Sequence, residues 1–146
     1  MGTLPRLPDV DMLVSLHETV LERVGGASGI RSIDAIAGAW GRAATRLHYA
    51  PDTDIPVLAA TLAVSIAKAH GFADGNKRTA YGAIAMTLAM NGYHLNAGPA
   101  ETVEAIVAAA AGDGDPERLG AWLADHAAPD PVYRALFDYD LAGPSG

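Results

Sequence analysis

The stretch "VLAATLAVSIAKAHGFADGNKRTAYGAIAMTLAM", residues 57–90, decides the fold of this chain. Its first part is apolar nearly all round, which is typical of a helix buried at the centre of a domain. After a short polar loop, a second run that starts at Lys77 is again apolar on most faces and closes at Asn91-Gly92. The stretch therefore predicts two buried helices that hold one polar loop between them.

Upstream of this stretch, two amphipathic patterns predict two further helices. Apolar residues recur at three- and four-residue spacing across 9–24, where Asp9 or Asp11 can cap the start. Ser32 can cap a second helix over 32–47. Both helices precede the central one and can pack against it.

Downstream, proline marks the start of two more helices. Pro99 opens one that ends near Gly112, and Pro116 stands at the first position of another, over 115–128. Segment 93–97 allows one short extended piece. We therefore predict an all-α fold, with six or seven helices around a central buried helix over 56–69 and at most one small β piece.

The C-terminal segment is set apart by a proline-rich break. We predict one domain over 1–128 and a tail over 129–146, with a short amphipathic helix in the tail. This helix either folds onto the functional site, binds a second copy of the chain or is loosely docked. The face that it would present carries Val132, Leu136 and Tyr139.

Composition excludes several classes of protein. The 146 residues contain no cysteine, so disulfides and thiolate chemistry are excluded, which suits a cytoplasmic location. We see no signal peptide and no apolar span of about 20 residues, and we expect no membrane association. A formal net charge of −7 argues against direct DNA binding.

The polar loop nevertheless gathers cations. Lys77 and Arg78 stand where a helix begins, and exposed cations there are disfavoured by about 0.3–1 kcal/mol each. Gly71 and Gly75 allow unusual backbone dihedrals, so that free N–H groups can converge on an anion. Such a loop is suited to phosphate, and Lys68 is a weaker candidate for a further phosphate contact.

The same loop contains a candidate base and a candidate metal ligand. His70 is the only local group with an ordinary pKa near neutrality, and Asp74 is the only nearby carboxylate, suited to Mg²⁺ on a substrate phosphate. Each residue alone has a simpler interpretation, as a helix C-terminal histidine or a helix N-cap. Their spacing within nine residues favours phosphoryl transfer.

The segment "HGFADGNKRTA" resembles the Fic/Doc family motif, H-x-F-x-[D/E]-[G/A]-N-[G/K]-R. The resemblance extends over roughly residues 9–127. Lys77 stands where Fic-type AMP transferases carry glycine, and lysine there is typical of Doc-type toxins. Position 75 is glycine, as in the AMP transferases. The matching motif positions are His70, Phe72, Asp74, Asn76 and Arg78.

The resemblance implies the all-α Fic fold and a set of residue roles. His70 would deprotonate a target hydroxyl, Asp74 would bind Mg²⁺, and Phe72 would anchor the loop in the core. A Doc-type protein transfers the γ-phosphate of ATP to a threonine of translation elongation factor Tu, which blocks translation. Its partner is a Phd-like antitoxin that covers the site. The phosphates would be held by Gly75, Asn76 and Arg78.

Two alternatives to a toxin kinase stay open. One is a Fic-type protein AMP transferase, which the glycine at position 75 favours. The other is a non-catalytic module that binds nucleotide without transferring any part of it. The intact His70, Asp74 and Arg78 argue against this second alternative.

Overall fold

Helices make up most of the computed structural model, which describes residues 4–142, with side chains as far as residue 138. No helix in this range is long and apolar enough to cross a membrane. The helices are α1 (Val10–Val24), α2 (Ile33–Tyr49), α3 (Ile55–Ala69), α4 (Asn76–Met90), α5 (Pro99–Ala110), α6 (Pro116–His126) and α7 (Pro131–Ala142). Two short strands, β1 (Tyr93–Leu95) and β2 (Ala127–Pro129), complete the fold.

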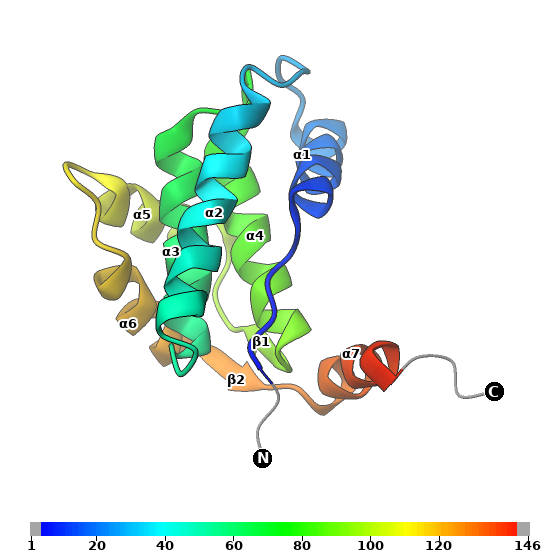
Figure 1. Ribbon diagram of the computed structural model, residues 1–146. Helices are drawn as coiled ribbons and strands as arrows, with labels where there is room; N and C mark the ends of the chain where they lie inside the picture. Colours follow the sequence, from blue (N-terminus) through cyan, green and yellow to red (C-terminus); the bar gives the residue numbers. More distant parts are fainter. Residues whose placement is uncertain (1–3, 143–146) are drawn as a thin grey trace.

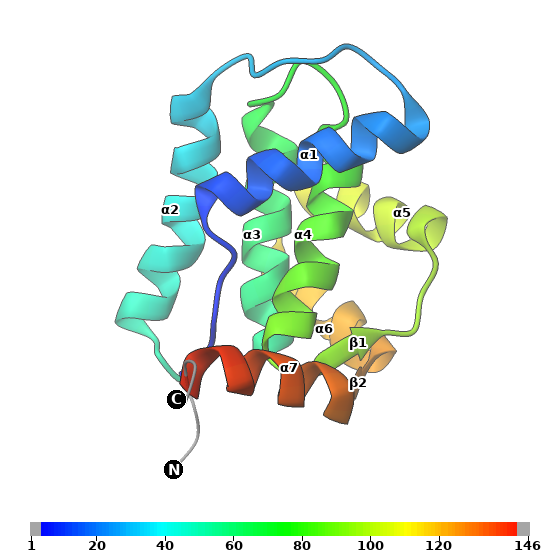
Figure 2. The ribbon, with the colours of Figure 1, turned by 90° about the vertical axis from the view of Figure 1, so that its right-hand side faces the viewer.

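Helix α3 lies at the centre, as predicted. Every residue from 58 to 66 is buried. Helices α2, α4, α5 and α6 all pack against it, while α1 crosses α4 on the side away from α5 and α6 (Figures 1 and 2). This packing confirms the prediction of an all-α fold around one buried helix.

Local sequence signals set where three of the helices begin. The side chains of Asp9, Ser32 and Asp115 each accept the N–H of the residue three positions on, at 2.8, 3.1 and 3.0 Å. These hydrogen bonds satisfy amides that the first turn of a helix leaves without a partner. The predicted caps of α1 and α2 and the predicted start of α6 are confirmed.

A two-stranded antiparallel sheet joins the end of α4 to the end of α6. Tyr93 pairs with Pro129 and Leu95 pairs with Ala127. The extended piece expected over 93–97 is therefore β1. The helix expected over 115–128 is wrong in its last two residues, because the chain leaves α6 after His126 to pair with β1.

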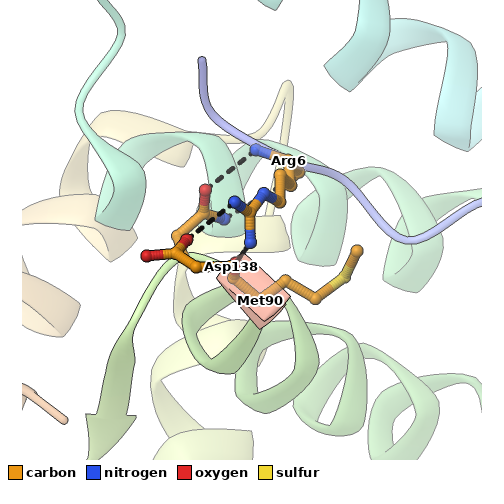
Figure 3. A network of polar contacts seen from close by, with 4 residues as sticks. Arg6, Met90 and Asp138 are labelled. Atoms are coloured by element: carbon orange, nitrogen blue, oxygen red, sulfur yellow. Dashed lines mark hydrogen bonds and ion pairs between the residues drawn. The ribbon is translucent and has the colours of Figure 1, made fainter. Parts of the chain in front are cut away.

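Arg6 ties the N-terminal segment to both α4 and α7. Its guanidinium donates to the Met90 carbonyl at 3.0 Å and to the Asp138 carboxylate at 2.9 Å (Figure 3). Its backbone N–H and C=O bond the Asn91 side chain at 2.8 and 2.9 Å. These contacts hold the N-terminal segment against α7 and the C-terminal end of α4.

Helix α7 packs at this same end, opposite the loop between α3 and α4 (Figures 1 and 2). The Asp130 N–H donates to the Gly92 carbonyl at 2.7 Å, and the Arg134 side chain lies against Gly92. These contacts fix α7 beside β1, so a tail folded onto the predicted site is wrong for the described residues. Val132 and Leu136 are exposed, and the Tyr139 side chain lies outside the described residues.

Asp130 lies directly before α7 and provides a test of pH dependence. Its carboxylate accepts the N–H of Val132 at 3.0 Å and of Tyr133 at 3.2 Å, and the His94 ring lies 3.1 Å away. The Tyr133 N–H contributes most to holding the pKa of Asp130 below its usual value, and partial burial opposes it. This stabilisation is present above about pH 3.9, where the unfolded carboxyl ionises, and is lost as pH falls through the lower folded pKa.

We expect Asp130→Asn to lower the melting temperature at pH 7, because the charged acceptor is lost. The gap between wild type and variant should close as the pH falls below about 3.9. Thermal unfolding followed by circular dichroism at a series of pH values measures this. A gap of constant size down to the acid limit would contradict the assignment.

Candidate functional site

The loop between α3 and α4 begins with an unusual backbone conformation at His70. This residue ends α3 with φ 50° and ψ 41°, and no other non-glycine residue in the described part of the chain has a positive φ. The expectation of unusual dihedrals is right for Gly75, with φ 77°, and wrong for Gly71. Gly71 is required for space instead, since a Cβ there would lie 2.5 Å from Cγ1 of Ile36.

Backbone hydrogen bonds hold this loop against the loop that joins α1 to α2. The amides of Arg31 and Ser32 both donate to the Gly71 carbonyl, at 2.8 and 2.9 Å. The Ala73 amide donates to the Gly29 carbonyl at 3.1 Å. Two segments far apart in the sequence thereby form one structural unit at this end of the molecule.

Phe72 and Asn76 fix the loop from inside. Phe72 is only 1% exposed, which confirms its predicted role as a core anchor. The Asn76 amide donates to the Phe72 carbonyl at 3.0 Å and its oxygen accepts the Phe72 N–H at 3.1 Å. Because the Asn76 side chain is engaged in this way, only its backbone N–H remains available to a ligand.

The start of α4 presents free backbone amides. Gly75 is the N-cap, without a side-chain cap, and the first backbone hydrogen bond runs from Thr79 to Gly75 at 2.9 Å. The amides of Asn76, Lys77 and Arg78 have no acceptor among the described residues. Open N–H groups at a helix start are a suitable site for an anion.

These amides lie beside a cavity of about 510 Å³. Residues 24–26, at the end of α1, form one side of it, and residues 73–78 form the other. The exposed side chains of Lys77 and Arg78 line it, and neither forms an ion pair within the described part of the protein. The cavity therefore combines two positive charges with the positive end of a helix.

Asp74 is the one carboxylate in this cavity. One of its oxygens accepts the Gly75 N–H at 2.8 Å. Residues 4–142 contain no cluster of three His, Asp or Glu side chains able to hold a metal by themselves. Mg²⁺ bound to substrate phosphates uses only one or two protein carboxylates, and Asp74 fits that arrangement.

The structure thus brings five of the predicted site residues together, Asp74, Gly75, Asn76, Lys77 and Arg78. His70 lies just before this group, with an exposed side chain, and is not among the residues that line the cavity. Lys68 lies elsewhere: its ammonium group donates to the carbonyls of Ala110 and Gly112, at the end of α5.

Two residues beside the cavity were not singled out from the sequence. His17 is buried in α1, and Gly26 packs against the Asp74 carboxylate. His17 shares its apolar spacing with Leu16, and Gly26 belongs to a Gly-Gly pair that reads as a helix stop. Because apolar spacing and a helix stop already account for these two residues, no signal in the sequence indicated that either one contacts the loop between α3 and α4.

Comparison with known proteins agrees with this geometry. The model of the Fic/DOC family matches residues 7–88, which include the whole loop and α4 almost to its end. The chain is also 34% identical over 101 residues to the protein kinase doc of Escherichia phage P1, across 69% of this chain and 79% of that protein. That relative is a phosphotransferase by its name. The family match over residues 7–88 contains both sides of the cavity described above. This chain belongs to the Fic/Doc family.

Proposed function

We propose that this chain is a Doc-type toxin kinase, which transfers the γ-phosphate of ATP to a threonine hydroxyl of elongation factor Tu and blocks translation. The observation that carries the proposal is the cavity at the start of α4. There Lys77 and Arg78 meet free backbone amides, and no protein acceptor among the described residues neutralises them. The kinase activity named for the phage P1 relative agrees with this chemistry.

Each site residue has a separate role in the proposed reaction. His70 accepts the proton of the threonine hydroxyl, whose oxygen then forms a bond to the γ-phosphorus. The bond between the γ-phosphorus and the bridging oxygen breaks, and ADP leaves. Arg78, Lys77 and the amides at the start of α4 hold the phosphate oxygens. Asp74 holds Mg²⁺, which lowers the negative charge of the phosphates when it is bound.

Lys77 favours phosphate transfer over AMP transfer. A glycine at this position leaves space and a free N–H for part of the triphosphate, whereas a lysine fills that space and adds a point charge. The nucleotide then binds in the reverse order and presents its γ-phosphate to the acceptor. Gly75 is the observation that favours AMP transfer as the second candidate function, since AMP transferases carry glycine there.

A Phd-like antitoxin is the proposed partner. The cavity is open to solvent at Lys77 and Arg78, and the nearby Val24 and Ile30 side chains are 50% and 45% exposed. A segment of the antitoxin that covers this surface would keep nucleotide and target away from His70. The proposed acceptor is a translation factor, which places the reaction in the cytoplasm.

The test is a transfer assay with purified chain, elongation factor Tu, Mg²⁺ and ATP labelled at either the α- or the γ-phosphate. We expect label on the target only from γ-labelled ATP, and a mass gain equal to one phosphate on a threonine peptide. Label from the α-phosphate, with the mass gain of an adenylate, would assign the chain to the AMP transferases.

Growth provides a second readout. Expression of the wild-type chain should arrest growth, and co-expression of the antitoxin should restore it. An unchanged growth curve, together with nucleotide binding but no labelled target, would favour a non-catalytic binding module.

Gly26 provides a further prediction about this cavity. Its φ is +121°, and a Cβ there would lie 2.7 Å from an Asp74 carboxylate oxygen. We expect Gly26→Ala to lower kcat/KM for phosphate transfer by about 10- to 100-fold, because the carboxylate must move. Gly29→Ala is the matched control: φ is +111° there, and its Cβ would meet nothing within 4 Å. Equal losses in both variants would mean that backbone strain alone is responsible.

A further inference from the structure

His17 connects α1 to the loop that builds the cavity. It is 2% exposed and contacts three residues of the loop, Phe72, Asp74 and Gly75. Its ring stacks on the Phe72 ring, with centroids 3.9 Å apart and planes 12° apart. Its Nε2 lies 2.7 Å from the Asp74 carbonyl oxygen, and its Cδ2 and Nε2 face the position of a Gly75 Cβ at 3.6 Å.

The direction of the hydrogen bond follows from its chemistry. A carbonyl oxygen only accepts, so the His17 Nε2–H donates to Asp74. No other described residue bonds this carbonyl. His17 therefore satisfies an acceptor that lies immediately before the N-cap of α4.

This carbonyl matters because of its place in the helix. If α4 extended by one more residue towards the N-terminus, the Arg78 amide would donate to the Asp74 carbonyl in the ordinary i to i−4 pattern. Gly75, with φ 77°, turns the chain so that the carbonyl meets His17 instead. The Arg78 amide consequently stays open towards the cavity.

We propose that His17 is a positioning residue of the phosphate-binding cavity. By holding the Asp74 carbonyl, it keeps the first turn of α4 open and sets the direction of the Asp74 side chain. The inference rests on the proposed function only in that the anion bound there is the phosphate of ATP. A buried histidine that serves packing alone would give the same burial and stacking, so the experiment must separate the two roles.

Three substitutions distinguish the effect of losing the His17 hydrogen-bond donor from the effect of losing its packing. His17→Phe keeps a ring against Phe72 and removes the donor. His17→Gln places an amide nitrogen near the position of Nε2 and restores the donor. Leu16→Ala is the control, since Leu16 lies on the same helix but packs against Gly82 in α4. It should loosen the contact between α1 and α4 without touching the loop.

The first measurement needs no ligand. Amide hydrogen exchange and amide chemical shifts of residues 74–78, followed by NMR, should change in His17→Phe and stay near wild type in His17→Gln and Leu16→Ala. Unchanged amides in His17→Phe would overturn the proposal. If His17→Phe does not fold, His17→Asn replaces it, because the shorter amide cannot reach the carbonyl.

The second measurement is calorimetric titration with a non-hydrolysable ATP analogue and Mg²⁺. We expect His17→Phe to weaken binding about 10-fold, with recovery in His17→Gln and no change in Leu16→Ala. Equal weakening in His17→Phe and Leu16→Ala would reduce His17 to a packing residue. A wild-type chain that binds no analogue would overturn the proposed function, while the amide measurement would still decide the role of His17.

Discussion

Replacing His70 with asparagine is expected to lower the rate of phosphate transfer about 10²- to 10⁴-fold, the usual contribution of a general base. Asparagine is the appropriate replacement because it tolerates the left-handed conformation that His70 adopts, with φ 50°. His70→Ala removes the same base, but alanine occurs in this left-handed region less often than histidine or asparagine. The asparagine variant therefore isolates the chemistry.

Single-turnover transfer to elongation factor Tu measures this effect directly. We expect the affinity for the ATP analogue to stay close to that of wild type, because His70 does not line the cavity at the start of α4. The melting temperature of His70→Asn should also stay unchanged, since His70 is exposed and its side chain bonds no described residue. A variant that retains a tenth or more of the wild-type rate would place the base elsewhere.

The parts of the fold that the sequence predicted are those whose signals are local. A hydrogen bond between a side chain and an amide three residues on sets where α1, α2 and α6 begin. The sequence alone therefore predicted Asp9 and Ser32 as caps and Pro116 as the first position of α6. The apolar surface of α3 likewise needs no knowledge of its neighbours. The loop from 70 to 78 could be predicted as a candidate site because its charged and titratable side chains are close together in the sequence.

The misjudged features depend on contacts between distant segments. Residues 127–128 leave α6 only because β1 offers a pairing edge. Lys68 lies two residues before His70, yet it bonds carbonyls at the end of α5. Gly71 has the local pattern of a turn residue, but it is required because Ile36 of α2 leaves no space for a side chain at this position. Helical spacing in one segment carries no information about these contacts.

The site contains both kinds of feature. Its charges, Lys77 and Arg78, follow directly from the motif. Its shape depends on α1, which supplies His17, and on the loop after α1, which supplies the Gly26 backbone. Both lie more than 45 residues earlier in the chain than Asp74. We infer that the motif defines the chemistry of the cavity, while α1 and the loop after it define its geometry.

Arg78→Ala is expected to produce the second large loss, about 30-fold or more in kcat/KM. The guanidinium is exposed, lines the cavity and forms no ion pair with a described residue, so its charge is available for phosphate. Truncating one partner of a buried, hydrogen-bonded charge pair costs about 2–5 kcal/mol. Because Arg78 is exposed, we use the lower end of this range, which corresponds to about 30-fold. Because the guanidinium holds phosphate oxygens, the loss should appear in ATP affinity as well as in rate.

Arg78→Lys and Arg118→Ala complete this experiment. Lysine keeps the charge but not the two parallel N–H groups, so partial recovery is expected. Arg118 is an exposed arginine on α6 and lines a different groove, so Arg118→Ala should leave ATP affinity unchanged. Titration of each variant with the ATP analogue, at low and at high salt, provides the measurement. Wild-type affinity in Arg78→Ala would mean that Lys77 and the helix amides hold the phosphates without it, and full recovery in Arg78→Lys would reduce Arg78 to a point charge.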